Sequence, residues 1–237
     1  MKLLDPIGDP LFCRWILIQP VDEHDQGMLP EETAHIRETL DQPFAVVPVR
    51  VDWFRELAPW TAPAPFKGQP DFGGGAADTL RAVLEGTSAL RQGKRALLGG
   101  YSLAGLFALW AGYQTDAFEG IAAVSPSVWY PGWDEYAEGN RIRAGKVYLS
   151  LGDREERTRN PVMSSVGDRI RRQHEICAAQ GVKTILEWNE GNHFRDPDKR
   201  TAAGFAWLMK AGEKLTGDER DDQVQHKCQW HPGTGIL

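Results

Sequence analysis

The segment GYSLA, with Ser102 at its centre, has the residue types and spacing of a nucleophile turn. It matches the Gly-x-Ser-x-Gly pattern with alanine in the last position. An apolar strand is predicted over 96–99 and an apolar helix over 103–112. A strand, a sharp turn and a helix in this order lift a serine hydroxyl to the top of a sheet, and the flanking residues must be small because strand and helix approach closely. The alternative is a tight turn in which Ser102 only caps a helix.

A serine nucleophile needs a general base, and His193 is the best placed histidine. The serine hydroxyl is a weak nucleophile near neutral pH, so a base must take its proton and a third group must orient that base. His193 lies in the segment EGNHF directly after the last predicted strand. A fold that carries its serine on such a strand, turn and helix places its histidine there. We interpret the other five histidines as surface residues.

The acid of such a triad should follow the strand predicted over 146–151, between the serine and the histidine in the chain. Three carboxylates compete in this loop: Asp153, Glu155 and Glu156. We predict Glu155, because an acid three residues after a glycine, here Gly152, is a common form of the loop. Asp153 would turn too early and cap the turn, and Glu156 would point the other way.

The oxyanion of the reaction needs two backbone N–H donors, and the pocket needs apolar walls. Leu103, directly after the nucleophile, is predicted to give one donor. The loop after the strand predicted over 45–51 is predicted to give the other, from Trp53 or else Phe54. This loop belongs to a segment rich in proline, glycine and tryptophan over 52–75, which is too long for a plain connection and favours a binding loop. Three aromatic residues are candidates for substrate contacts, with core packing as the alternative for each: Trp60, Trp129 and Tyr130.

The order Ser102, Glu155, His193, the segment GGYSLAGLFALW and a Trp-rich loop after an early strand resemble a known family. It is the esterase family of α/β-hydrolases that holds siderophore (enterochelin) esterases, S-formylglutathione hydrolases, feruloyl esterases and mycolyl transferases. The likeness covers about residues 14–215. It implies an ester-hydrolysing enzyme that needs no metal and no organic cofactor.

The pattern along the chain predicts the α/β-hydrolase fold, with a mostly parallel sheet and helices on both faces. Short apolar runs alternate with longer helical stretches, and several runs are continuously apolar, as in strands buried on both faces. Strands are predicted over 14–20, 45–51, 96–99, 120–125, 146–151 and 183–188. Helices are predicted over 30–40, 75–90, 103–112, 161–180 and 197–215. We expect one domain over 1–215 without a large lid, followed by a polar tail over 216–237.

The composition is that of an ordinary globular chain of 237 residues with a net charge of −6. The acidic balance argues against a nucleic-acid partner. An uncharged stretch over 96–115 is long enough to span a bilayer, but its glycines and serine favour a buried strand, turn and helix, so no membrane association is expected. Three widely spaced cysteines fit a reducing compartment, and the N-terminal segment has no signal-peptide core, so a cytoplasmic location is expected.

These observations predict a serine esterase that acts on a small-molecule ester. Ser102 would be acylated, His193 would carry the proton, and Glu155 would orient His193. Two alternatives stay open: an acyltransferase that uses the same triad, and a binding protein that keeps the fold without the chemistry. The tail residues His226, Cys228 and His231 are too few for a zinc site, so no metal is expected.

Overall fold

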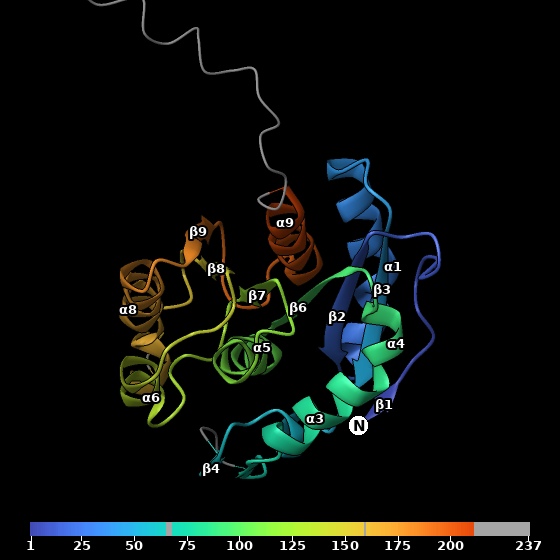
Figure 1. Cartoon of the computed structure of the whole chain (residues 1–237). Coiled ribbons are helices and arrows are strands. Elements are labelled where there is room, and N and C mark those ends of the chain that lie inside the picture. Colours follow the sequence, from blue (N-terminus) through green and yellow to red (C-terminus); the bar gives the residue numbers. More distant parts are fainter. Residues whose placement is uncertain (65–67, 159, 211–237) are drawn as a thin grey trace, which may run out of the picture.

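A seven-stranded sheet forms the centre of the protein (Figure 1). The computed structural model describes residues 1–64, 68–158 and 160–210. The strand order is β1-β3-β2-β6-β7-β8-β9, and all neighbours pair in parallel except β1, which is antiparallel to β3. The strands of this sheet are β1 (Lys2–Leu3), β2 (Trp15–Val21), β3 (Phe44–Arg50), β6 (Arg95–Tyr101), β7 (Gly120–Val124), β8 (Lys146–Gly152) and β9 (Lys183–Asn189). Two further strands, β4 (Thr61–Ala62) and β5 (Phe72–Gly73), form a small separate ribbon.

Helices cover both faces of the sheet. One face carries α1 (Glu23–Thr39) and α9 (Pro197–Lys210), which pack against each other. The other carries α3 (Ala76–Gly86), α5 (Ser102–Gln114) and α8 (Val166–Ala179), as Figure 1 shows. The short helices are α2 (Trp53–Glu56), α4 (Ser88–Arg91), α6 (Trp133–Gly139) and α7 (Pro161–Ser164). The predicted single α/β domain is therefore confirmed, and the predicted tail over 216–237 lies outside the described residues.

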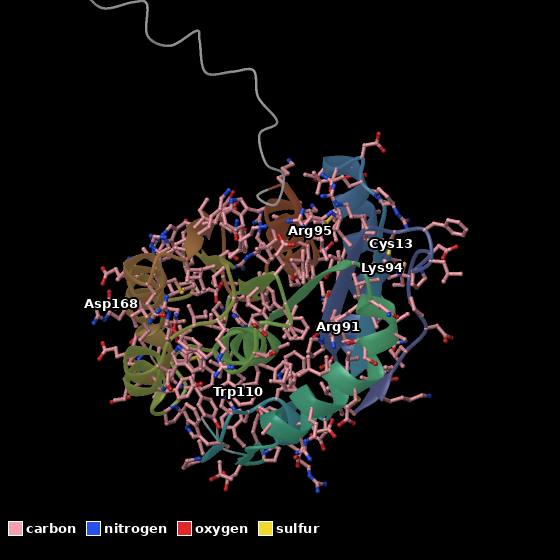
Figure 2. The ribbon with its side chains drawn as sticks, in the orientation of Figure 1. Cys13, Arg91, Lys94, Arg95, Trp110 and Asp168 are labelled. Atoms are coloured by element: carbon pink, nitrogen blue, oxygen red, sulfur yellow. The ribbon has the colours of Figure 1, made fainter. Side chains whose placement is uncertain are left out.

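The long uncharged stretch over 96–115 is buried in the protein core. Its first part is β6 and its second part is α5, in which every residue from Leu103 to Tyr113 is buried. Figure 2 shows Trp110 of α5 within the packed interior, whereas Cys13, Lys94 and Arg95 gather where β6 begins. Within the described ranges, no helix is long and apolar enough to cross a bilayer.

All six predicted strands are present, with ends shifted by at most two residues. Three helix predictions need correction. The helices predicted over 75–90 and 161–180 are each divided in two, into α3 and α4 and into α7 and α8. The first helix is predicted to start at Pro30, but α1 begins at Glu23 and contains Pro30 in its interior. The start is fixed by Asp22, whose side chain accepts a hydrogen bond from the Asp25 N–H. Proline is favoured in the first turn of a helix, which is consistent with a start at Pro30. The cap formed by Asp22 gives the earlier start.

Glu32 of α1 is a buried carboxyl group whose hydrogen-bond partner is a side-chain amide. It is 3% exposed, and its Oε2 accepts a hydrogen bond from Gln19 Nε2 at 3.1 Å. Within residues 1–64, 68–158 and 160–210, its Oε1 and the Oε1 of Gln19 have no hydrogen-bond partner. Burial raises the pKa of Glu32 to about 8, so the folded protein holds this carboxyl in its neutral form at pH 7.

We expect the buried proton of Glu32 to make stability fall as the pH rises from about 4.5 to about 8. The native state keeps a proton there that the unfolded chain releases, so unfolding becomes easier through this window and levels off above it. Glu32→Gln should remove this slope, and its free energy of unfolding should exceed that of the wild type by up to a few kcal/mol at pH 8. Urea unfolding across the pH range measures it, with the exposed Glu31→Gln as control. Equal slopes for wild type and Glu32→Gln would contradict the assignment.

Candidate active site

Ser102 lies where β6 ends and α5 begins, in a strained turn. Its φ is 57°, in the left-handed region that residues other than glycine rarely adopt. A Cβ on Gly100 would lie 2.6 Å from the Cβ of Ala104, and a Cβ on Gly105 would lie 2.9 Å from the oxygen of Gly100. The turn therefore requires small residues on both sides of the serine, and Ala104 meets this requirement in place of glycine. The local geometry is that of the predicted nucleophile turn.

The structure brings the three predicted triad side chains together. The Nε2 of His193 lies 3.1 Å from the Oγ of Ser102, and its Nδ1 lies 2.7 Å from the Oε2 of Glu155. Ser102 follows β6, Glu155 follows β8, and His193 follows β9. Because the carboxyl ends of parallel strands meet at one edge of the sheet, residues that are 38 and 91 positions apart become neighbours.

The two competing carboxylates serve other contacts. Asp153 accepts a hydrogen bond from the Gly191 N–H at 2.8 Å, so it caps the turn as the sequence indicated. Glu156 lies 3.4 Å from Nη1 of Arg171 on α8. Of the three carboxylates, Glu155 is therefore the one in contact with His193.

Glu155 is a buried carboxylate with every oxygen engaged. Its side chain is 4% exposed, and its Oε1 accepts hydrogen bonds from Gly152 N at 2.7 Å, Ser125 Oγ at 2.7 Å and Arg200 Nη2 at 2.9 Å. Burial alone would raise the pKa of Glu155, but the hydrogen bond and charge of His193, together with Ser125 and Arg200, outweigh it and lower the pKa to about 2. The carboxylate is therefore ionised throughout the neutral range and available to orient the imidazole.

A cavity of about 360 Å³ opens beside Ser102 and His193. Its size suits a small acyl or aryl group. Its apolar lining comes from Trp129, Met163, Val166 and Phe194, and its polar lining includes Arg154, Arg157, Thr158 and Asn160. Phe194 is 86% exposed, so an apolar ring stands at the mouth directly after the histidine.

Only one of the three predicted substrate-contacting aromatic residues lines this cavity. Trp129 does so, whereas Tyr130 has no exposed surface and its hydroxyl donates to the Trp60 carbonyl at 2.5 Å. The Trp60 indole N–H donates to the Pro131 carbonyl at 2.8 Å, and its ring packs on Tyr130. For Trp60 and Tyr130 the structure thus favours packing over substrate binding, because their polar groups are used within the protein.

The predicted oxyanion donors occupy different positions relative to the site. Leu103 is the second residue of α5, directly after the nucleophile. Trp53 is the first residue of α2, after the capping residue Asp52. The strand that leads to Trp53, β3, is separated from β6 by β2, and Trp53 is not among the cavity-lining residues. The donor role of both N–H groups stays a prediction.

Three residues near the triad were missed by sequence reasoning. Ser125 and Arg200 contact Glu155, and the buried Ser127 places its Oγ 3.4 Å from that of Ser102. The position of Ser125 at the end of a predicted strand was an available signal, since strand ends gather at this edge. Arg200 gave none, because an arginine in a helix normally faces water. In the described part of the chain, no cluster of three or more His, Cys, Asp or Glu side chains could hold a metal ion.

Comparison with known proteins identifies the fold. A scan against protein-family models and a search of curated proteins give no match. Among solved structures, the siderophore hydrolases EstA and EstB from Aspergillus nidulans are 17% and 18% identical, with TM-scores of 0.62 and 0.64. The matches cover 85% and 84% of this chain, and 84% and 83% of theirs. The ferric enterobactin esterase of Salmonella typhimurium is 16% identical with a TM-score of 0.62, and the match covers 88% of this chain and 54% of that protein. The chain therefore has the α/β-hydrolase fold of these esterases, as the resemblance implied.

Proposed function

We propose that the protein is a serine hydrolase that cleaves a carboxylic ester or thioester through an acyl-enzyme on Ser102. The observation that carries the proposal is the hydrogen-bonded chain from Ser102 through His193 to Glu155 beside a cavity. The solved structures that share the fold are esterases, which supports ester hydrolysis as the reaction class. A protein that only binds a ligand would not need an ionised, buried carboxylate aligned with this imidazole.

In the proposed reaction, each member of the triad has a defined part. The Nε2 of His193 takes the proton of Ser102 as its Oγ attacks the carbonyl carbon, and then delivers that proton to the leaving alcohol or thiol when its bond to the carbonyl breaks. Water next attacks the acyl carbonyl carbon and gives a proton to Nε2 of His193. Nε2 then returns this proton to Oγ of Ser102 as the bond between Oγ and the acyl group breaks. Throughout, Glu155 accepts the Nδ1–H hydrogen bond and stabilises the imidazolium that forms twice per turnover.

A fluorophosphonate probe tests this function directly. It should attach covalently to Ser102 in the full-length protein, and peptide mass spectrometry should find the adduct on the segment that contains it. Ser102→Ala should stay unlabelled. A panel of p-nitrophenyl esters from acetate to long chains, with feruloyl and formyl-thiol substrates, would then identify the acyl preference. An unlabelled wild-type protein would exclude a serine hydrolase and leave a binding role.

We expect Trp53→Pro to lower kcat by roughly 10²- to 10³-fold if the Trp53 N–H is the second oxyanion donor. Proline removes the N–H but fits the first position of a helix, where Trp53 lies, so α2 should still form. Trp53→Ala keeps the N–H and is the matched control. Full activity in a folded Trp53→Pro protein would assign the donor to another residue of this loop, first to Phe54, the second candidate.

A further inference from the structure

Arg200, on α9, is an arginine with almost no exposed surface. It is 4% exposed, and its guanidinium reaches the ends of several strands. Its Nη2 donates to Glu155 Oε1 at 2.9 Å, and its Nε donates to Asn189 Oδ1 at 2.9 Å. Its Nη1 donates to Tyr101 Oη at 2.7 Å and reaches the Asn192 carbonyl at 3.5 Å. A buried cation is costly unless it is fully paired, and this one has a carboxylate and several oxygens as partners.

These partners adjoin all three members of the triad. Tyr101 directly precedes Ser102, Asn192 directly precedes His193, and Glu155 is itself a member. Tyr101 also donates its hydroxyl hydrogen to the His193 carbonyl at 2.8 Å. One guanidinium group thus connects the three segments that must stay in register for proton transfer.

We propose that Arg200 is a positioning residue of the catalytic site, which holds the Glu155 carboxylate with Oε2 toward His193 and ties the histidine loop to the end of β6. This inference rests on the serine-hydrolase function proposed above. Arg200 is not among the cavity-lining residues, and it contacts the oxygen of Glu155 that faces away from the imidazole. It therefore acts through Glu155 and the histidine loop rather than on substrate. Only arginine offers donors in these fixed directions, since lysine supplies a point charge.

The charge of Arg200 has a second consequence, for the pH dependence of the reaction. Without the guanidinium, a buried carboxylate is harder to ionise, so the pKa of Glu155 rises. The reaction needs an ionised Glu155, so this change moves the acidic limb of the kcat/KM profile to higher pH.

The other titratable groups around the guanidinium do not reverse this expectation. Burial raises the pKa of Tyr101 to about 12 and also raises that of Tyr148 on β8, so both stay neutral in the working range. Asp25 on α1 interacts with Tyr101, and burial raises its pKa to about 6. Asp25 titrates in wild type and variants alike, so the comparison between them isolates Arg200.

The experiment compares Arg200→Met, which keeps much of the side-chain volume, with Arg200→Lys, which keeps the charge. We expect Arg200→Met to lower kcat between about 10- and 100-fold with little change in KM, as for partners that orient a reacting group. Its acidic limb should move to higher pH. Arg200→Lys should return the limb toward that of the wild type while recovering only part of kcat. Arg195→Met is the control, since Arg195 is exposed and forms ion pairs with Glu190 and Asp196 at the surface.

A double-mutant cycle with Glu155→Gln separates positioning from general structural damage. If Arg200 acts through Glu155, Arg200→Met should cost much less in the Glu155→Gln background than in the wild type. Equal losses in both backgrounds with an unmoved acidic limb would overturn the proposal. If Arg200→Met does not fold, the pH profile and kcat of Arg200→Lys decide, because a lysine variant indistinguishable from wild type in both would also overturn it.

A readout without substrate keeps this inference distinct from the proposed function. The Nδ1 proton of His193, held by Glu155, should give a downfield proton resonance in the wild type, and Arg200→Met should shift or broaden it while Arg195→Met should not. If that resonance responds as expected but no ester is turned over, the proposed function fails and the positioning role stands. If esters are turned over and Arg200→Met behaves like Arg195→Met, only the positioning role fails.

Discussion

Replacing Ser102 by alanine is expected to lower kcat for ester hydrolysis by roughly 10⁵- to 10⁶-fold, because members of a triad act as a unit and the loss of the nucleophile alone removes nearly the whole effect. The substitution deletes one oxygen of a half-buried side chain and keeps the Cβ, so the fold and the thermal transition should be retained. Steady-state hydrolysis of the best p-nitrophenyl ester, with active-site titration of the wild type, measures the change.

Ser127→Ala is the matched control for this variant. Ser127 is a buried serine whose Oγ lies 3.4 Å from that of Ser102, but no hydrogen bond connects it to His193 in the described structure. It should retain most of the activity. A severe loss in Ser127→Ala combined with substantial turnover in Ser102→Ala would show that the nucleophile is Ser127 and not Ser102.

Glu155→Gln should lower kcat by up to about 10⁴-fold, as loss of the triad acid does in serine proteases. The surroundings dictate how the amide would sit. Three donors, from Gly152, Ser125 and Arg200, already surround Oε1, so the amide oxygen must take that place and the NH₂ group must face Nδ1 of His193. Nδ1 then has to accept, which puts the ring proton on Nε2 and prevents it from taking the proton of the serine.

The neighbouring carboxylates provide controls for this prediction. Glu156→Gln and Asp153→Asn should lower kcat only mildly, since neither carboxylate contacts His193. Glu156 pairs with Arg171, and Asp153 accepts from the Gly191 N–H. Asp153→Asn can still accept the hydrogen bond from Gly191 through its amide oxygen. If either variant costs more turnover than Glu155→Gln, at equal thermal stability, the acid has been assigned to the wrong residue.

The sequence predicted those parts of the site that depend on local geometry. The nucleophile turn was predictable because its small residues report a close approach of strand and helix, which the contacts of Gly100 confirm. The choice of Glu155 depended on a three-residue offset, and the structure supplies the reason: the Gly152 N–H donates to the Glu155 carboxylate across that offset. The central strands β2, β3, β6, β7 and β8 were predictable because strands buried on both faces require continuous apolar runs.

Other features depend on contacts that leave no local trace. Arg200 meets Glu155 across 45 positions, and nothing in its own segment distinguishes it from an exposed helical arginine. Tyr130 and Trp60 were candidates for pocket residues because aromatic side chains serve binding and packing equally well. The contact between them, across 70 positions of the chain, is what favours packing. The early start of α1 likewise depends on the cap by Asp22, which the sequence pattern did not reveal.

Residues other than glycine that have a left-handed backbone lie near the active edge of the sheet in the described part of the chain. Among the described residues, the non-glycine residues with positive φ are Ser102 at 57°, Ser125 at 41° and Asp196 at 48°. They are the nucleophile, a donor to Glu155 and the residue that precedes α9. Such conformations cost on the order of 1–3 kcal/mol each. A laboratory evolution campaign that screened only for heat resistance would therefore favour glycine at position 102, and its most thermostable clones would include ones without a nucleophile.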